Sequence, residues 1–124
     1  MESVLIIDDE QSILQVFDYA LSRCGFDVET AADGREGLQK FLSGRFDLVV
    51  TDMTMPGITG DKLAMALCSI RKDIPVILCT GFSPQMTEKK AYEMGIKGFL
   101  MKPIVKYEMA RMIRKILDHP KRAG

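Results

Sequence analysis

The sequence of 124 residues lacks several features that mark common classes of protein. It has only three cysteines, and none lies in a C-x-x-C or Cys/His metal-binding spacing. We therefore interpret Cys24, Cys68 and Cys79 as reduced thiols that act as small buried apolar residues. No segment approaches the roughly 20 apolar residues of a membrane span, and the N-terminus lacks the basic start and apolar run of a signal peptide. These absences favour a cytoplasmic protein without direct membrane contact.

An excess of charge of either sign is also missing. Lysine plus arginine numbers 17 and aspartate plus glutamate numbers 17, so the formal net charge is zero. A nucleic-acid-binding chain normally carries a basic excess, so we expect no direct nucleic-acid partner. Hydrophobic residues make up 47% of the sequence, which is enough to bury a core. The length predicts a single domain over residues 1–124, with a core at about 4–117 and a C-terminal tail at 118–124.

Short apolar segments alternate with amphipathic segments along the whole chain. The strand-like segments are 4–7, 27–31, 46–51, 75–80 and 98–101. Most of them are continuous apolar runs, which are typical of strands covered on both faces. Five such β-then-α units predict an α/β domain with a parallel sheet and helices on both faces.

The amphipathic segments predict five helices. Asp33 is a predicted N-cap of the second helix, and Ser83-Pro84 is a plausible start of the fourth, which runs to about Met94 with a weak apolar stripe. The predicted core faces of the other four helices comprise Ile13, Val16, Phe17, Ala20, Leu21 and Cys24 in the first, Leu38, Phe41 and Leu42 in the second, Leu63, Ala66, Leu67 and Ile70 in the third, and Met109, Met112, Ile113, Ile116 and Leu117 in the last.

Polar residues end the strongest strands. Asp8 and Asp9 follow the first strand, Asp52 ends the third, Thr80 ends the fourth and Lys102 follows the fifth. In a parallel sheet the carboxyl ends of the strands meet at one edge, and ligands bind there. The fold therefore predicts that these five residues, which are far apart in the sequence, gather in one site.

A cluster of three carboxylates needs a cation. Two like charges 4 Å apart cost about 4 kcal/mol at an effective dielectric near 20. Lys102 can supply one positive charge, and Mg²⁺, which prefers carboxylates together with water and phosphate oxygens, can supply the rest. Carboxylates, a hydroxyl, a lysine and Mg²⁺ make up a phosphoryl-transfer site in which one carboxylate attacks phosphorus.

Each of these residues also has an ordinary structural interpretation when it is taken alone. Asp8 or Asp9 could cap the first helix, and Asp52 could belong to a turn. Thr80 could simply end a strand, and Lys102 could be a solvated surface lysine. The phosphoryl-transfer hypothesis is favoured because all five fall at the same predicted edge of the sheet.

The strand ends carry four short motifs in a fixed order. They are Asp8-Asp9-Glu10, Asp52-Met53-Thr54-Met55-Pro56-Gly57-Ile58-Thr59-Gly60, Thr80-Gly81 and Lys102-Pro103. The intervals are 44 residues from Asp8 to Asp52, 28 to Thr80 and 22 to Lys102. From Val4 to about Leu117, this ordered set resembles the response-regulator receiver domain of two-component signalling.

The resemblance implies a single doubly wound (βα)5 domain with a flavodoxin-like sheet of order 2-1-3-4-5. It implies that Asp52 accepts a phosphoryl group from a phosphohistidine of a sensor histidine kinase or from acetyl phosphate. Asp9 and Asp52, with the backbone carbonyl of Thr54, would bind Mg²⁺, and Asp8 would hold a metal-bound water. Lys102 would contact the phosphoryl oxygens, and its bond to Pro103 would be cis. Such a domain is a phosphoacceptor rather than an enzyme in the usual sense, although it assists its own phosphorylation and dephosphorylation.

The resemblance also implies a conformational switch. The hydroxyl of Thr80 would move onto the new phosphate, and Phe99, three residues before Lys102, would move inward with it. The face formed by the fourth helix, the fifth strand and the last helix would then present a changed surface to a downstream effector, or to a second phosphorylated copy. Phe82, two residues after Thr80, could shield the aspartyl phosphate from water.

Three other classes of protein share part of this pattern. An aspartate-nucleophile phosphatase of the haloacid-dehalogenase type needs D-x-D after the first strand, whereas this chain has Asp8-Asp9-Glu10. A nucleotide-binding module of the same winding needs a glycine-rich loop after the first strand, which is missing. A degenerate receiver used only for docking would lack some of the required residues, and all of them are present here. Whether the receiver is a stand-alone regulator or belongs to a hybrid sensor kinase stays open.

Overall fold

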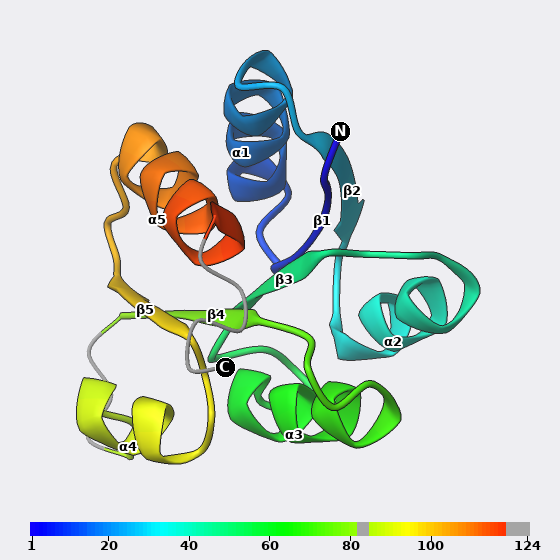
Figure 1. The fold of residues 1–124 in the computed structure, drawn as a ribbon. Helices are drawn as coiled ribbons and strands as arrows, with labels where there is room; N and C mark the ends of the chain where they lie inside the picture. The colour runs from blue at the N-terminus through cyan, green and yellow to red at the C-terminus, as the bar shows by residue number, and fades with distance from the viewer. Residues whose placement is uncertain (82–84, 119–124) are drawn as a thin grey trace.

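Five parallel strands form one sheet in the order β2-β1-β3-β4-β5, as predicted. The computed structural model describes residues 1–81 and 85–118 (Figure 1). The strands are β1 (Ser3–Ile7), β2 (Asp27–Ala31), β3 (Leu48–Asp52), β4 (Val76–Thr80) and β5 (Gly98–Met101). The helices are α1 (Gln11–Arg23), α2 (Gly34–Ser43), α3 (Gly60–Ile70), α4 (Glu88–Glu93) and α5 (Lys106–Asp118).

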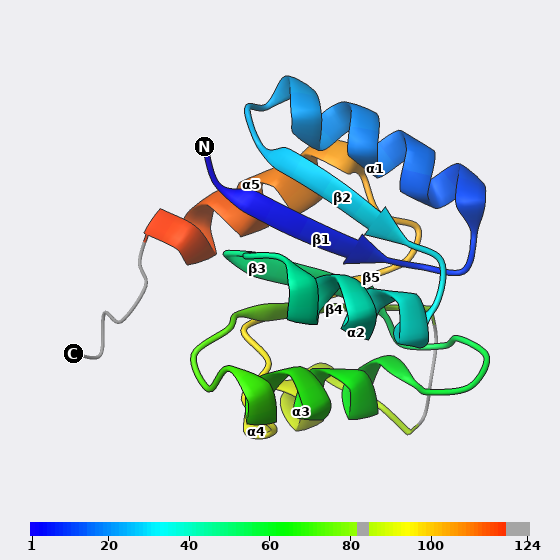
Figure 2. The same ribbon diagram turned by 90° about the vertical axis from the view of Figure 1, so that its right-hand side faces the viewer.

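Helices cover both faces of the sheet, because every strand is joined to the next by a helical crossover. α1 and α5 lie on one face, and α2, α3 and α4 lie on the other (Figures 1 and 2). β3 and β4 are buried along their whole length, whereas β2 alternates between exposed and covered residues, as expected of an edge strand. Each face has its own apolar cluster, one beneath α1 and α5 and one beneath the other three helices.

The burial of the helices corrects four of the predicted core positions. Val16, Leu42 and Ile70 are exposed, and so is Cys24, which the sequence predicted to be a buried thiol. In α1, Phe17, Ala20 and Leu21 are buried as predicted, and Leu14 is also buried, a position that the sequence analysis did not include. A helix against a sheet buries only a narrow stripe, so a residue one position away from that stripe points to solvent.

The fourth helix is shorter than predicted. α4 begins at Glu88, and the Thr87 side chain caps it by accepting a hydrogen bond from the backbone N–H of Lys90 at 3.2 Å. Gln85 and Met86 are not helical, so the helix does not start at Ser83-Pro84. Residues 82–84 and 119–124 lie outside the described residues, including Phe82 and most of the predicted tail.

Two other helix predictions are confirmed. The Asp33 carboxylate accepts a hydrogen bond from the backbone N–H of Glu36 at 2.8 Å and caps α2. In α5, Met109 and Ile113 are buried, and Met112, Ile116 and Leu117 pack against the same apolar cluster. In the part of the chain that the structure describes, no helix combines the length and apolar character needed to cross a bilayer.

Candidate functional site

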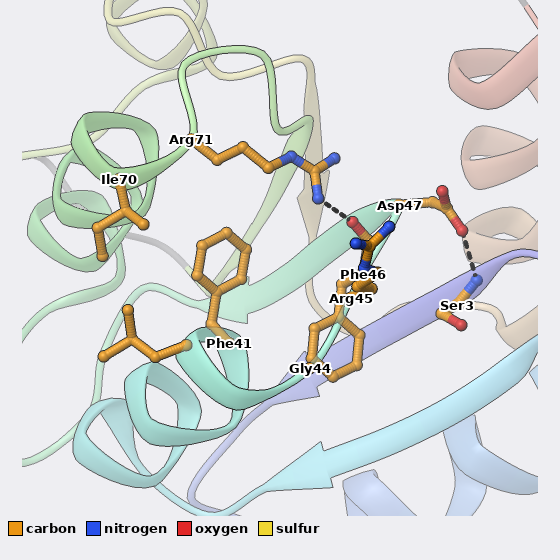
Figure 3. A pocket seen from close by; sticks show the side chains of 9 residues that line it. Ser3, Phe41, Gly44, Arg45, Phe46, Asp47, Ile70 and Arg71 are labelled. Carbon is orange, nitrogen blue, oxygen red and sulfur yellow. Dashed lines mark hydrogen bonds between the residues drawn. The ribbon is translucent and has the colours of Figure 1, made fainter.

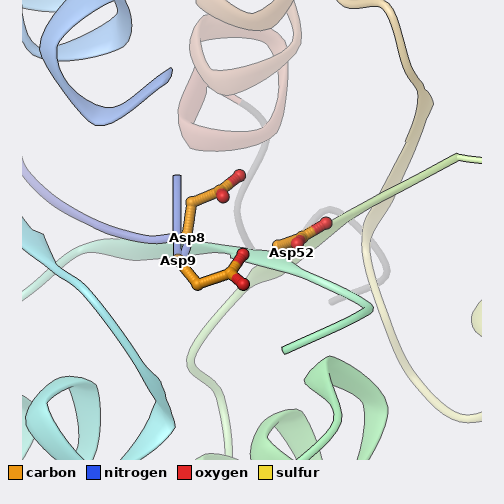
Figure 4. A group of neighbouring side chains, drawn as sticks. All are labelled: Asp8, Asp9 and Asp52. Carbon is orange, nitrogen blue, oxygen red and sulfur yellow. The ribbon is translucent and has the colours of Figure 1, made fainter. Parts of the chain in front are cut away.

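The predicted polar residues meet at the carboxyl edge of the sheet. β1 and β3 are adjacent, and Ile7 pairs with Thr51. Asp8, the residue after β1, therefore lies beside Asp52, the last residue of β3. One carboxylate oxygen of each of Asp8, Asp9 and Asp52 lies within 4.8 Å of the others (Figure 4). Asp8 and Asp52 are buried, whereas Asp9 is exposed. The parallel topology therefore brings the adjacent Asp8 and Asp9 together with Asp52, which lies 44 residues after Asp8 in the sequence.

Lys102, which follows β5, extends its side chain toward the carboxylates at the ends of β1 and β3. Its Nζ lies 3.0 Å from Asp52 Oδ1 and 3.4 Å from Asp8 Oδ2. The peptide bond that follows it, to Pro103, is cis, as the resemblance implies. Sequence reasoning gave no role to Glu10, whose Oε1 lies 3.9 Å from the same ammonium. The run of three acidic residues at 8–10 was the available signal for this fourth carboxylate.

Thr80 lies on the strand next to Asp52. Asp52 pairs with Cys79 in the sheet register, so Thr80 is one residue further along β4. Thr80 is fully buried, and its hydroxyl donates a hydrogen bond to the carbonyl of Gly81 at 2.8 Å. Thr54 lies in the loop two residues beyond Asp52 and has an exposed side chain.

Phe99 lies on β5, the neighbour of β4. It is 8% exposed and belongs to the apolar cluster that includes Met86 and Ala91 of the α4 region. In this structure Phe99 therefore packs in the apolar cluster beneath the α4 region.

Burial controls the electrostatics of the site. Loss of solvent around Asp52, together with the nearby charges of Asp8 and Asp9, raises the pKa of its carboxyl above the usual value, although Lys102 acts in the opposite direction. Burial alone would lower the pKa of Lys102, but its contacts with Asp52 and Asp8 outweigh that effect and raise it. The lysine therefore stays protonated and holds the two buried carboxylates together.

The residues present fit a hard divalent cation. The three clustered aspartates and Glu10 offer only carboxylate oxygens, and Lys102 is the single cation among the described residues that contacts them. One ammonium leaves most of the negative charge uncompensated. Carboxylate oxygens at this spacing suit Mg²⁺, which takes one or two carboxylates and keeps several waters.

Gly60 fixes the backbone around Asp52. Its N–H donates to the carbonyl of Met53 at 2.8 Å, and the N–H of Met53 donates to Cys79 at 2.8 Å. A Cβ at position 60 would lie 2.9 Å from the carbonyl carbon of Asp52 and closer still to its oxygen. α3 can therefore approach the end of β3 only because residue 60 has no side chain. The sequence motif includes this glycine, but sequence reasoning gave it no role.

Replacement of Asp52 by asparagine should stabilise the metal-free protein at neutral pH. Folding raises the pKa of the Asp52 carboxyl above its value in the unfolded chain, near 3.8. The protonated carboxyl therefore favours the folded state below that pH, and this stabilisation is lost as the pH rises through the pKa of the folded protein. Thermal unfolding of Asp52→Asn in EDTA should give a higher Tm than the unmodified chain at pH 7, and the difference should shrink toward pH 3. An equal or lower Tm of Asp52→Asn at pH 7 would show that the contact with Lys102 stabilises the Asp52 carboxylate by more than burial destabilises it.

Comparison with known proteins defines the class of this fold and site. The family model for the response regulator receiver domain matches residues 4–114. The chain is similar to a receiver domain protein of Clostridium thermocellum, with a TM-score of 0.91 and 29% identity over the whole of both chains. It is also similar to the response regulator TrrA of Thermotoga maritima, solved in complex with Mg²⁺-BeF, with a TM-score of 0.83 and 31% identity over 93% of this chain and 98% of that one.

The chain belongs to the response regulator receiver domain family of two-component systems. It is 30% identical to the alkaline phosphatase synthesis transcriptional regulatory protein PhoP of Bacillus subtilis over 116 residues, 94% of this chain and 48% of that protein. The chain spans about half the length of the first curated relatives that it matches.

Proposed function

We propose that Asp52 accepts a phosphoryl group from the phosphohistidine of a sensor histidine kinase, or from a small donor such as acetyl phosphate. The observation that carries this proposal is the contact of a buried carboxylate with a protonated lysine, 3.0 Å between Asp52 Oδ1 and Lys102 Nζ. A carboxylate that has lost most of its water is a better nucleophile, and the ammonium beside it is ready to receive the oxygens of the incoming group.

The transfer is a single displacement at phosphorus. An oxygen of Asp52 forms a new bond to phosphorus, and the bond from phosphorus to the imidazole nitrogen or the acetate oxygen breaks. Lys102 is placed to neutralise the phosphoryl oxygens. Asp9 and Asp52, with the carbonyl of Thr54, would hold Mg²⁺, and Asp8 would hold a metal-bound water. The ion supplies further charge neutralisation when bound. The similar protein TrrA was solved with Mg²⁺-BeF, which supports this ligand class.

Incubation with acetyl phosphate tests the proposal. With Mg²⁺, the chain should gain one phosphoryl group that is stable in acid and labile in base, and with EDTA it should gain almost none. Continuous release of inorganic phosphate without a stable adduct would favour a phosphatase instead. We accordingly propose that the chain is a stoichiometric acceptor rather than an enzyme acting on other molecules.

Removal of the Asp9 charge should abolish the stabilisation by Mg²⁺. A ligand that binds only the folded state adds about 2.7 kcal/mol when its concentration is a hundredfold above Kd. For a domain of this size that corresponds to a rise in Tm of roughly 10 °C. Asp9→Asn should show little of this rise, because it removes one of the carboxylates that would hold the ion. Asp9 is exposed, and among the described residues its side chain makes no hydrogen bond or ion pair whose loss would itself change the stability. An undiminished Mg²⁺ effect in Asp9→Asn would remove Asp9 from the metal site.

We further infer that Thr80 and Phe99 transmit phosphorylation to the surface. They lie on adjacent strands, and the register pairs Leu78 with Phe99 and Thr80 with Met101. Phe99 packs in the same cluster as Ala91 of α4, a helix of only six residues. A phosphate on Asp52 would attract the Thr80 hydroxyl away from Gly81 and leave room that Phe99 and α4 can fill. Phosphorylation would then shift the population from the packing of Phe99 and α4 seen here to a second packing.

Thr80→Ala should separate phosphorylation from its transmission. The variant keeps Asp52 and Lys102, so it should still gain a phosphoryl group from acetyl phosphate, within about tenfold of the normal rate. Without the hydroxyl, the amide chemical shifts of α4 and β5 should change much less on phosphorylation. Equal changes in Thr80→Ala and in the unmodified chain would exclude Thr80 from the relay.

The face formed by α4, β5 and α5 fits the role of an effector surface. It carries several exposed apolar side chains, Tyr92, Met94, Met101, Val105 and Tyr107. We propose that this face binds a downstream effector, or a second phosphorylated copy, with no direct contact to nucleic acid or membrane. Relatives such as PhoP are transcriptional regulators of about twice the length. The proposal is the same for a stand-alone regulator and for the receiver of a hybrid sensor kinase.

A further inference from the structure

A pocket lies at the opposite edge of the sheet from Asp52, away from the cluster of carboxylates. It has a volume of about 520 Å³ and is formed by the last turns of α2 and α3, the start of β1 and the segment that leads into β3 (Figure 3). Its lining includes Phe41, Leu42, Arg45, Phe46, Ile70 and Arg71. None of these residues belongs to the phosphoryl-transfer site, so the pocket needs a separate explanation.

The apolar part of the pocket is left open to solvent. Leu42 is 62% exposed and Ile70 is 49% exposed, although the amphipathic pattern of both helices predicts them in the core. Phe41 and Phe46 are buried and form the inner part of the lining. Two large aliphatic side chains from different helices therefore flank one cavity with an aromatic interior, which is an arrangement typical of the centre of a protein interface.

Arg45 gives the pocket a binding point for an anionic group, in a lining that also includes the exposed carboxylate of Asp47. Arg45 is exposed, and within residues 1–81 and 85–118 no hydrogen bond or ion pair engages it. Arg71 donates to the carbonyl of Phe46, and its Nε lies 3.6 Å from the exposed carboxylate of Asp73. The carboxylate of Asp47 accepts a hydrogen bond from the backbone N–H of Ser3 at 2.8 Å. The guanidinium of Arg45 is thus available for a carboxylate brought by a partner.

We propose that this pocket is a docking site for an acidic, leucine-bearing segment of a partner protein. The partner's aliphatic side chain would cover Leu42 and Ile70, and its carboxylate would pair with Arg45, where a guanidinium can form two parallel hydrogen bonds. A free small molecule fits less well, because small-molecule sites usually enclose most of their ligand, whereas Leu42 and Ile70 are exposed to solvent. Charge complementarity and the open apolar rim both favour a protein segment.

This site is independent of phosphorylation. Asp47 at the pocket and Asp52 at the phosphoacceptor site are separated by the length of β3, which at about 3.3 Å per residue is roughly 16 Å. Asp52→Asn should therefore bind the acidic segment with unchanged affinity. Failure of the docking proposal and failure of the proposed function would then be seen in different experiments.

A titration followed by NMR tests the docking site. The probe is a capped peptide with two leucines flanked by glutamates, added to the full chain with labelled methyl groups and arginine side chains. The methyl signals of Leu42 and Ile70 and the Nε–H signal of Arg45 should move together. A peptide with glutamine in place of glutamate, and one with serine in place of leucine, should each bind about tenfold more weakly or worse.

Matched variants locate the binding. Arg45→Gln and Leu42→Ser should each lower the affinity for the acidic peptide by about tenfold. Lys115→Gln and Val16→Ser, which remove an exposed charge and an exposed apolar residue elsewhere, should leave that affinity unchanged. All four changes are at the surface, so each variant should keep its Tm. The proposal is wrong if the peptide does not bind, if the glutamine peptide binds equally well, or if Arg45→Gln and Leu42→Ser bind normally.

Discussion

Asp52→Asn is expected to lose phosphorylation by acetyl phosphate almost completely, by at least a factor of about a thousand. Asparagine has nearly the same shape, and its side-chain oxygen can still accept a hydrogen bond from Lys102, so the fold and the site should be kept. Its amide is a very poor nucleophile toward phosphorus, and it offers no anionic oxygen. The loss would therefore report the chemistry of the side chain rather than its packing.

The measurement is intact-protein mass spectrometry after incubation with acetyl phosphate and Mg²⁺. Asp73→Asn is a matched control, since Asp73 is an exposed aspartate whose contact, with Arg71, is at the other end of the molecule. The control should gain one phosphoryl group at the normal rate. If Asp52→Asn is phosphorylated as fast as the control, another side chain is the acceptor and the assignment of Asp52 is wrong.

Gly60→Ala is expected to lower both stability and phosphorylation. The added Cβ would meet the backbone carbonyl of Asp52 and a methyl group of Leu78, 2.9 Å away. Backbone cannot rotate out of the way, so either α3 or the end of β3 must shift. We expect a destabilisation of about 2–3 kcal/mol, or roughly 10 °C in Tm. A shift of about 1 Å in Asp52 would slow phosphoryl transfer by about a hundredfold.

Gly81→Ala is the control for this prediction. Gly81 also lies at the carboxyl edge of the sheet, but a Cβ there would meet no atom within 4 Å in residues 1–81 and 85–118. Its effect on stability should stay within about 0.5 kcal/mol. Urea unfolding and the rate of phosphorylation by acetyl phosphate measure the two effects. A Gly60→Ala variant that is as stable and as reactive as Gly81→Ala would mean that α3 does not set the position of Asp52.

The arrangement of the site could be predicted because it follows from the topology. Continuous apolar runs such as that of β1 are typical of strands covered on both faces, and five β-then-α units favour parallel pairing with helical crossovers. Once the strands are parallel, the residues that end them meet at one edge. Asp8, Asp52 and Lys102 were found in this way, and the 3.0 Å contact between Lys102 and Asp52 is the result.

Other features depend on packing that a periodic pattern does not contain. Leu42 follows Phe41, and only three-dimensional packing decides which of two neighbouring apolar residues takes the buried position. The start of α4 at Glu88 depends on the local hydrogen bond by which the Thr87 side chain caps the helix. The role of Gly60 depends on how closely α3 approaches Asp52, which is a tertiary distance.

Chemical mapping of the phosphorylated residue in the unmodified chain tests the central claim most directly. Borohydride reduces an aspartyl phosphate to homoserine, so peptide mapping after reduction identifies the acceptor. We expect homoserine at position 52 alone, formed only when Mg²⁺ was present during phosphorylation. Homoserine at position 8 or 9, or a phosphoryl group retained on histidine or on a hydroxyl, would contradict it.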